Sequence, residues 1–433
     1  MSRTKKHSAK QFSKDKLSYK LLYKTANKTK KIKTSIINKK LTARIIIKDN
    51  IGGIVADKDT IKELLESIGY HVEVVVYNDI KDKLGLKQSN LFKKVNIQIF
   101  IEHVLLENIP ADKSYILINQ EYISDWDISL MKAGSVIPLC KTHEGLKTLL
   151  KLGITTAKYV GFGNNRSLSH ININIDSIVK IPNLFIHIVG SSPLKGTRLL
   201  IETWINKKIK EPLIITANNK AGGNTNLFKF WKSLKPKIKE LPEHVLNKWV
   251  VWSDFMKLQN TNTKSVSNLP LFESIGTSSV YFCNTLLDYN VIQFLQSVAD
   301  VHMCPSLIEG WGQYIDEGRR SKAVVLTLNA PPMNELIENN FSGILVNASR
   351  GPSMKQLLPH GWTQYFTKDK EYNKFLYKTY KTSQTDLYNG ITKILKMSQE
   401  QKRKLGNNAF KQSQLDYEKF SKKFIEIINN NSS

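Results

Sequence analysis

Short apolar runs alternate with segments of helical periodicity along most of the chain, beginning near residue 43. Residues 43–47 are an apolar run typical of a buried strand, and the pair Gly52-Gly53 is typical of a turn. Isoleucines and leucines then recur at helical spacing over residues 61–68, and Gly69 is a suitable helix terminator. This order predicts a βαβ unit and, repeated along the chain, a parallel sheet.

The same pattern predicts two sheets in succession. Further strands of the first sheet are expected at residues 72–77, 97–101, 115–119, 135–140 and 157–162. Residues 163–180 are polar and lack a helical face, so we expect them to link the sheets. A helix is expected around residues 199–204. Strands of the second sheet are expected at residues 184–189, 213–216, 250–252, 280–282, 299–304, 324–327 and 343–346.

These patterns predict an α/β protein with two Rossmann-like, doubly wound parallel-sheet domains facing across a cleft. Residues 1–40 are expected to form a basic tail, residues 41–180 the first domain with the linker at its end, and residues 181–400 the second domain. Residues 401–433 are expected to form a closing helix that packs back on the first domain. Its apolar positions are Phe410, Leu415, Phe420 and Phe424. Ligands of such folds bind at the carboxyl ends of the strands.

Composition excludes some classes of protein. Hydrophobic residues make up 41% of the 433 residues, yet no run approaches the roughly 18 apolar residues of a membrane span. The N-terminus is rich in lysine and lacks the pattern of a secretory signal, which favours a cytoplasmic location. Cys140, Cys283 and Cys304 lie far apart, and we interpret them as small buried hydrophobic residues.

The formal net charge of +27 is unevenly distributed. Residues 1–40 contain 14 Lys or Arg against one Asp, so this tenth of the chain carries a net charge of +13. The rest of the chain carries the remaining +14. That excess suits a protein that handles anionic nucleotides, and it equally suits a peripheral membrane surface or nucleic acid. Charge alone therefore does not decide the function.

The most informative segment spans residues 304–346. A predicted buried strand leads into Glu309-Gly310-Trp311-Gly312, and a helix carrying Glu317 is expected to begin there. Glycines allow close backbone approach, and the free N–H groups of a helix start favour a diphosphate. The two carboxylates are separated by roughly 7 Å of helical rise. They are therefore suited to bracket one diphosphate and to accept hydrogen bonds from sugar hydroxyls on either side of it.

This segment resembles the donor site of the retaining glycosyltransferases of family 4, which have the GT-B fold. Glu309 and Glu317 are separated by seven residues and follow Pro305-Ser306; a strand, a Pro-rich loop at 330–332, Glu335 and the run 343–346 come next. The resemblance implies that the second domain binds a nucleotide sugar, with the acceptor on the first domain. It also implies that Gly310, Trp311, Gly312 and Glu317 bind the donor, and that Glu309 is catalytic.

A second match follows the first strand of the second domain. Family members usually place an Arg after the first Gly of this loop and a Lys before the second, both contacting the donor diphosphate. Lys195 fits the second position, between Gly190 and Gly196, and is expected to be catalytic. Ser191 occupies the position at which the Arg is expected, and the resemblance implies that it too contacts the donor. Either Arg198 compensates for this missing charge, or phosphate binding is weaker; an ordinary strand-to-helix turn with an exposed Lys is the alternative.

Several first-domain residues are weaker candidates. Gly52 and Gly53 resemble the glycine-rich turn near the family's donor, and we expect them to bind the donor. Residues 119–121 and 141–142 follow predicted strands and receive no assigned role. His103 and His143 are considered because family members often use a His near the leaving phosphate, although a structural role is the simpler interpretation for both.

Asp125-Trp126-Asp127 offers a competing interpretation. Two acids separated by one residue hold a divalent cation in the other large glycosyltransferase fold, with oxygen ligands of the kind that Mg²⁺ or Mn²⁺ prefers. Asp57-Lys58-Asp59 repeats the spacing, which shows how easily it arises. We therefore expect no metal in the site.

The resemblance implies transfer of a sugar from a nucleoside diphosphate donor, of UDP or GDP type, to an acceptor hydroxyl with retention. No other cofactor is expected. The acceptor is a glycan, a lipid-linked sugar or a protein, with peripheral contact to an anionic membrane left open and nucleic acid not expected as a partner. The alternative from another class is a non-enzymatic basic scaffold of the same fold that binds nucleic acid or anionic membrane.

Overall fold

The computed structural model describes most of the chain after the basic N-terminal segment. Among the described residues, no helix is both long and apolar enough to cross a membrane. The three cysteines are buried and free. Most of the predicted linker and Gly52 lie outside the described residues. The described ranges are 41–48, 53–77, 93–104, 110–164, 178–218, 224–258, 270–358, 367–373 and 375–430.

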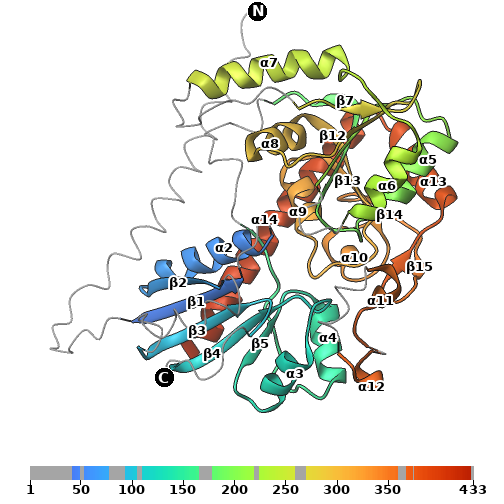
Figure 1. Ribbon diagram of the computed structural model, residues 1–433. Coiled ribbons are helices and arrows are strands. Elements are labelled where there is room, and N and C mark those ends of the chain that lie inside the picture. Colours follow the sequence, from blue (N-terminus) through green and yellow to red (C-terminus); the bar gives the residue numbers. More distant parts are fainter. Residues whose placement is uncertain are drawn as a thin grey trace, which may run out of the picture. The chain divides into compact units, whose positions relative to one another are not determined.

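The first sheet has six strands in the order β2-β1-β3-β4-β5-β6, and every neighbouring pair is parallel (Figure 1). The strands are β1 (Thr42–Lys48), β2 (His71–Tyr77), β3 (Val95–Ile101), β4 (Ala111–Ile118), β5 (Ile137–Cys140) and β6 (Lys158–Tyr159). Its helices are α2 (Gly53–Ser67), α3 (Asp125–Lys132) and α4 (His143–Lys151).

Both faces of this sheet are buried. Successive residues of a strand point to opposite faces, so Ile45 and Ile47 enter one hydrophobic cluster while Ile46 enters another. β3 repeats this division, with Ile99 in the first cluster and Phe100 in the second. Continuous apolar strands are what a parallel sheet covered on both faces requires.

The second sheet has eight strands in the order β14-β13-β12-β7-β8-β11-β10-β9. All pairs are parallel except those of β10, which runs antiparallel to β9 and β11. The strands are β7 (Ile181–Gly190), β8 (Leu213–Ala217), β9 (Lys237–Ile238), β10 (Glu273–Ser274), β11 (Val280–Cys283), β12 (Ala299–Cys304), β13 (Val324–Leu328) and β14 (Ile344–Val346). The α/β architecture with two parallel sheets is therefore confirmed.

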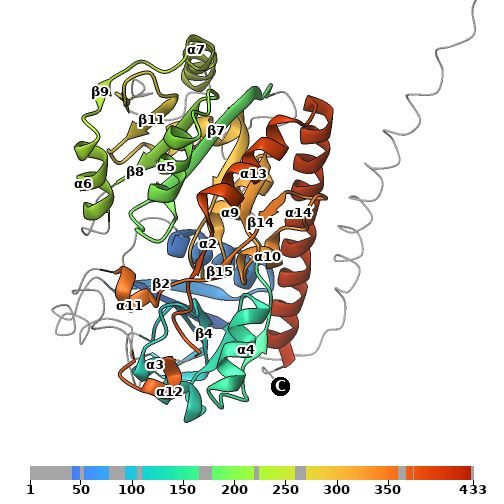
Figure 2. The ribbon, with the colours of Figure 1, turned by 90° about the vertical axis from the view of Figure 1, so that its right-hand side faces the viewer.

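Helices accompany the second sheet and continue beyond it (Figures 1 and 2). Those before β14 are α5 (Thr197–Asn206), α6 (Thr225–Ser233), α7 (Glu243–Leu258), α8 (Tyr289–Val298), α9 (Gln313–Arg320) and α10 (Met333–Leu336). Those after it are α11 (Met354–Leu357), α12 (Lys370–Asn373), α13 (Gln384–Leu395) and α14 (Gln399–Asn430), with the short strands β15 (Ser349–Arg350) and β16 (Tyr380–Lys381).

The strand predicted at residues 250–252 is wrong, because this segment lies within α7. Val245, Trp249 and Trp252 are buried against one cluster, and their spacing of four and three residues is that of one helix face. Val250 and Val251, which suggested a strand, are 55% and 68% exposed. The local β propensity was overridden by an amphipathic period that extends beyond the three residues considered.

α14 is the closing helix. It packs against α9 and β13, which belong to the second sheet's region, and against α2 beside the first sheet. Phe420 and Phe424 are fully buried, and Phe420 lies 4.7 Å from Phe162 between ring centroids. Leu415 is 49% exposed, so it does not belong to the buried face.

Candidate active site

The candidate site is built from loops that follow parallel strands of both sheets. One loop, residues 305–312, joins β12 to α9, and a second, residues 191–196, joins β7 to α5. Residues 119–121 follow β4 in the first sheet. In doubly wound folds, these carboxyl ends are where ligands bind.

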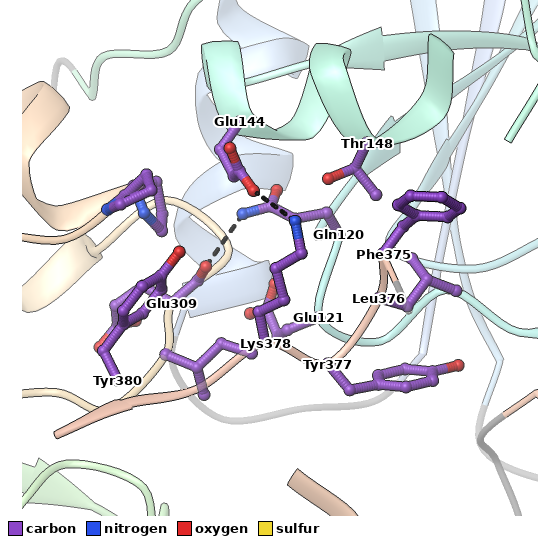
Figure 3. Close-up of a pocket in the computed structure, with 13 residues that line it drawn as sticks. Gln120, Glu121, Glu144, Thr148, Glu309, Phe375, Leu376, Tyr377, Lys378 and Tyr380 are labelled. Atoms are coloured by element: carbon purple, nitrogen blue, oxygen red, sulfur yellow. Dashed lines mark hydrogen bonds and ion pairs between the residues drawn. The ribbon is translucent and has the colours of Figure 1, made fainter. Parts of the chain in front are cut away.

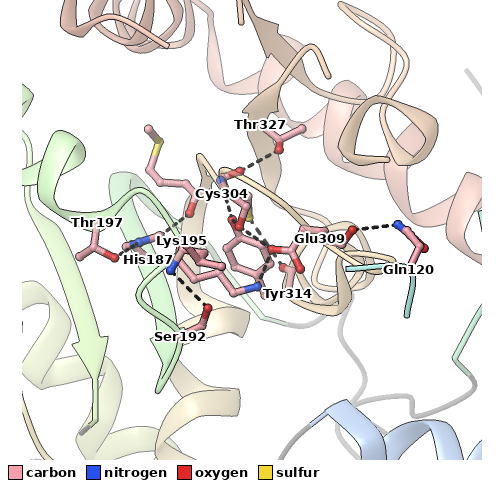
Figure 4. A network of polar contacts seen from close by, with 12 residues as sticks. Gln120, His187, Ser192, Lys195, Thr197, Cys304, Glu309, Tyr314 and Thr327 are labelled. Atoms are coloured by element: carbon pink, nitrogen blue, oxygen red, sulfur yellow. Dashed lines mark hydrogen bonds and ion pairs between the residues drawn. The ribbon is translucent and has the colours of Figure 1, made fainter. Parts of the chain in front are cut away.

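Glu309 is the centre of a polar network. Its Oε1 accepts hydrogen bonds from Lys195 Nζ and Ser306 Oγ (Figure 4), and the residue is 8% exposed. Ser306 Oγ also lies 2.6 Å from the hydroxyl of Tyr314, and Lys195 Nζ lies 4.2 Å from the centre of the Tyr314 ring. Oε2 has no hydrogen-bond partner among the described residues. One oxygen is thus held in place while the other remains available to a ligand.

Lys195 is placed beside Glu309 by the glycine that follows it. Gly196 has φ of 71°, and a Cβ there would lie 2.2 Å from the carbonyl oxygen of Pro305. Only glycine fits both the left-handed backbone and the close approach. Leu307 N–H also donates to the Leu194 carbonyl at 2.8 Å, so the two loops are joined through their backbones.

His187 connects the elements that carry these two loops. Its Nδ1 lies 2.7 Å from the Met303 carbonyl oxygen, and its Nε2 lies 3.0 Å from Thr197 Oγ1 (Figure 4). A carbonyl only accepts, so Nδ1 carries the proton and Nε2 accepts from the threonine hydroxyl. Burial lowers the pKa of His187 to about 4, which keeps the ring neutral at pH 7. His187 therefore fixes β7, β12 and the start of α5 together.

α9 begins directly after the loop that carries Glu309. Gly312 precedes the helix with φ of 104°, and no side chain caps the helix. The first N–H groups of a helix lack partners within it and carry the positive end of its dipole. Ile315 and Asp316 N–H groups donate to the Gly312 carbonyl, which leaves the amides before them for a ligand. The structure thus places an uncapped helix start beside Glu309 and Lys195.

Glu317 lies on the second turn of α9 and does not contact Glu309. Its carboxylate accepts hydrogen bonds from Gln296 Nε2 at 2.7 Å and from Gln313 Nε2 at 3.0 Å. Burial raises the pKa of Glu317, and these two hydrogen bonds act against that rise. The side chain is half-buried. Neither Glu309 nor Glu317 points into bulk solvent.

The first domain reaches the same loop. Gln120 Nε2 donates to the backbone carbonyl of Glu309 at 3.0 Å (Figure 3). A Cβ on Gly310 would lie 2.6 Å from Asn119 Oδ1 and 2.7 Å from the Glu121 carboxylate, so glycine is required there. Lys141, 4% exposed, donates to Asn119 Oδ1 at 2.8 Å and also pairs with Asp57. Residues 119–121, for which no role was predicted, therefore form one wall of the site.

Residues 377–380 of the second domain make contacts around this wall. Tyr380 N–H donates to the Leu307 carbonyl at 2.7 Å, and Lys378 Nζ lies 3.6 Å from Glu144 Oε1 (Figure 3). Tyr377 donates its hydroxyl proton to the Ile123 carbonyl at 2.7 Å. The cavity left between Glu121, Glu309 and this segment measures only about 20 Å³. That is room for about one water molecule.

Glu121 is a buried carboxyl in the wall of the site. It is buried, and its Oε2 has no hydrogen-bond partner among the described residues. Burial raises the pKa of Glu121 to about 8, and the nearby charges of Glu309 and Glu102 add to the rise. The carboxyl is therefore largely protonated at neutral pH and able to donate a hydrogen bond.

This pKa gives a prediction for stability. A carboxyl with a raised native pKa binds more protons in the native than in the unfolded state, so its contribution to stability is lost as pH rises from about 4.5 to above 8. Glu121→Gln removes this dependence. We expect the unfolding equilibrium constant of the wild type, relative to Glu121→Gln, to rise at least about tenfold between pH 5 and 8.5 in urea titrations. Parallel curves for the two proteins would contradict the raised pKa.

The other residues predicted to contact the donor do not belong to the Lys195–Glu309 network. Gly53 begins α2, and a Cβ there would lie 2.6 Å from Gln313 Oε1, so it faces α9. Trp311 is 5% exposed and packs edge-on against Phe162, with centroids 4.9 Å apart. Ser191 has no polar contact with Lys195 or Glu309. Arg198 pairs with Glu202 on the surface and is not directed at Glu309 in this structure.

The histidine and aspartate candidates have structural partners. His103 Nδ1 lies 2.9 Å from Asp127 Oδ2, and Asp127 also completes the cap of α3. Burial lowers the pKa of His103, but the hydrogen bond and charge of Asp127 raise it overall.

Asp125 accepts from Thr367 Oγ1 and Lys368 N–H. Within the described ranges, no three His, Cys, Asp or Glu side chains gather in a metal-binding arrangement. His143 stacks on Tyr159 at 3.9 Å between centroids.

Comparison with known proteins identifies the fold. No protein-family model matches the sequence, and no curated protein matches it. A glycosyltransferase from Rickettsia africae ESF-5 is similar in structure, with a TM-score of 0.55 and 14% sequence identity over 91% of this chain and 99% of that one. Sucrose-phosphate synthase from Thermosynechococcus elongatus is also similar, with a TM-score of 0.53 and 11% identity over 90% and 98%.

A third similar structure is Anabaena Alr3699/HepE in complex with UDP and glucose, with a TM-score of 0.51 and 12% identity over 89% of this chain and 99% of that one. At these identities the likeness establishes the fold. The chain has the GT-B fold of glycosyltransferases, with two Rossmann-like α/β domains, as the sequence predicted.

Proposed function

We propose that this protein is a glycosyltransferase that moves a sugar from a nucleoside diphosphate sugar to an acceptor hydroxyl. The observation that carries the proposal is the Lys195–Glu309–Ser306 network beside the uncapped start of α9. A cation and unpartnered amides suit a diphosphate, while a carboxylate oxygen without a partner suits a sugar hydroxyl. This combination is what a nucleotide-sugar donor requires.

The proposed mechanism is transfer with retention, in the manner of family 4. The bond between the anomeric carbon and the diphosphate oxygen breaks, and the acceptor oxygen bonds to that carbon on the same face. The acceptor proton passes to the departing phosphate oxygen. Lys195 and the amides of Gly310 to Gly312 stabilise the charge that develops on the diphosphate, while Glu309 orients the sugar. No metal ion is needed in this scheme.

The donor is proposed to be a UDP or GDP sugar. The similar Anabaena protein was crystallised with UDP and glucose, which supports the first of these. Lys195 supplies a single ammonium to the diphosphate, because Ser191 takes the place of the second cation that family 4 usually offers. The acceptor is proposed to be a glycan, a lipid-linked sugar or a protein, reached from the first domain.

A panel of nucleotide sugars tests the activity. The full chain is incubated with UDP and GDP sugars, and release of nucleoside diphosphate is measured together with the thermal shift that each nucleotide causes. Release from one donor and stabilisation by its nucleotide support the enzyme. Salt-sensitive binding of nucleic acid without release or stabilisation would instead support the non-enzymatic scaffold.

Glu317 is proposed to bind the ribose of the donor. Glu317→Ala removes the carboxylate that is proposed to accept the ribose hydroxyls and that Gln296 and Gln313 hold in place. Affinity for the nucleoside diphosphate is therefore expected to fall about tenfold, by roughly 1.4 kcal/mol. Titration calorimetry measures this change. Glu317→Gln, which keeps the shape, should recover part of the affinity. Unchanged affinity in the Ala variant would contradict the assigned role.

A further inference from the structure

A pocket of about 480 Å³ lies beside the candidate active site. Its walls come from the loops after β5 and β6, from Trp311 and Leu336, and from one face of α14. This volume is within the range of small-molecule sites. Lys195 and Glu309 do not line it, so the nucleotide-sugar proposal leaves the pocket without a ligand.

Three lysines of α14 give the pocket its charge. Lys422 and Lys423 follow Lys419 by three and four residues, so both neighbour Lys419 on the helix, and all three line the pocket. All three are exposed, and none has a hydrogen bond or ion pair with another described residue. Lys141, the fourth lysine of the wall, is already neutralised by Asp57. None of the three ammonium groups of α14 is therefore neutralised by a carboxylate of the described residues.

The acidic side chains of the pocket offset these lysines only in part. Glu335 accepts two backbone N–H groups at the start of α4, at 2.7 and 2.9 Å. Asp416 pairs with the buried Arg319. Glu426 is the one remaining carboxylate of the wall. Backbone N–H groups leave the charge of Glu335 in place, so three unpaired ammonium groups meet the two unpaired carboxylates of Glu335 and Glu426. The remaining positive balance favours a negatively charged group.

Aromatic side chains also line the pocket. The Tyr159 ring stacks on His143, and Lys423 Nζ lies 4.7 Å from the centre of the same ring. Trp311 and Phe162 meet behind it. Aromatic faces pack against the apolar face of a sugar ring, and lysines bind phosphate oxygens. Because Trp311 lies between Gly310 and Gly312, a ligand here would touch the loop that carries Glu309.

We propose that this pocket binds a phosphorylated saccharide, at a site distinct from the nucleotide-sugar site. The phosphate pairs with Lys419, Lys422 and Lys423, and the sugar ring lies against Tyr159. Such a ligand is either the acceptor of the transfer or an effector that acts through Trp311. An acceptor and an effector would both present a phosphate and a sugar ring to the pocket, and mass spectrometry distinguishes the two roles.

The test uses the full chain with glucose 6-phosphate as the probe and glucose as its uncharged counterpart. Titration calorimetry should show one saturable site for glucose 6-phosphate and at least about tenfold weaker binding of glucose. The triple variant Lys419→Ala/Lys422→Ala/Lys423→Ala should weaken glucose 6-phosphate binding at least about tenfold. Because these side chains are exposed, the fold and the thermal shift caused by the nucleoside diphosphate should be retained.

The matched control is Arg403→Ala/Lys404→Ala/Lys411→Ala, which removes three exposed positive charges from the same helix outside the pocket. It should bind glucose 6-phosphate within about twofold of the wild type. Equal loss in both triple variants, unchanged binding in the pocket variant, or no preference over glucose would overturn the site. The readout is binding, so such a failure leaves the proposed glycosyl transfer standing.

Mass spectrometry after incubation with the active nucleotide sugar shows whether the phosphorylated saccharide is the acceptor or an effector. A product heavier than glucose 6-phosphate by one transferred sugar identifies the pocket as the acceptor site. Unchanged glucose 6-phosphate together with an altered affinity for the nucleoside diphosphate identifies it as an effector site. Both results support the pocket as a binding site for phosphorylated saccharides.

Discussion

Glu309→Gln is expected to lower turnover of the nucleotide sugar by about 10²–10³-fold, the range found when one group that stabilises a transition state is removed. The carboxylate accepts from Lys195 and Ser306 through one oxygen. The other oxygen is the one that we propose accepts from the sugar. A glutamine in this place is neutral, and its amide group presents a donor where the network requires an acceptor. Steady-state release of nucleoside diphosphate measures the change.

The control for Glu309→Gln is Glu338→Gln, which makes the same chemical change at an exposed position. Its turnover should match that of the wild type. Circular dichroism and urea unfolding should show that both variants fold. If Glu309→Gln turned over the nucleotide sugar at a nearly normal rate, Glu309 would be removed from the reaction.

Lys195→Ala is expected to lower turnover by about 10²-fold or more. Lys195 is the cation that the β7–α5 loop directs at Glu309, and neutralising the departing diphosphate is the largest electrostatic task of the proposed reaction. Its loss also leaves Glu309 without its charge partner in a largely buried position, so stability should fall as well. Stopped assays of diphosphate release and urea unfolding separate the two effects.

Two further variants test whether Lys195 acts as a unit with Glu309. The double variant Lys195→Ala/Glu309→Gln should be little slower than the worse single variant, because residues of one network are not additive. Lys210→Ala, which removes an exposed lysine near α5, should leave turnover unchanged. Additive losses in the double variant would show that the two residues act independently.

The strand pattern of the sequence was sufficient to predict two parallel sheets in an α/β protein, and the GT-B fold was predicted from the resemblance. Apolar runs such as residues 43–47 and 299–304 form central strands buried on both faces, where few other structures are possible. The failure at residues 250–252 has a different cause. Val250 and Val251 are exposed, while the helix is fixed by Val245, Trp249 and Trp252, which pack against a core that the sequence does not reveal.

The sequence predicted only those parts of the candidate site whose residues belong to short, recognisable sequence motifs. Glu309, Gly310, Gly312 and Lys195 lie in loops next to strands, so their types and spacing indicate a donor site. Whether they bind a donor stays a prediction. Gln120 lies 189 residues from its partner Glu309, and no short-range pattern links them. The sequence also did not show whether Arg198 would face the predicted phosphate site or pair with Glu202, four residues later. That choice depends on the orientation of one side chain.

The central claim is that a pyrophosphate rests against the start of α9, between Lys195 and the amides of Gly310 to Gly312. A crystal structure of the full chain with the nucleoside diphosphate that stabilises it most is the direct measurement. We expect density for the two phosphates within hydrogen-bond distance of Lys195 Nζ and these amides, with the ribose at Glu317. A diphosphate bound elsewhere, with the Lys195–Glu309 pair unchanged, would contradict the account.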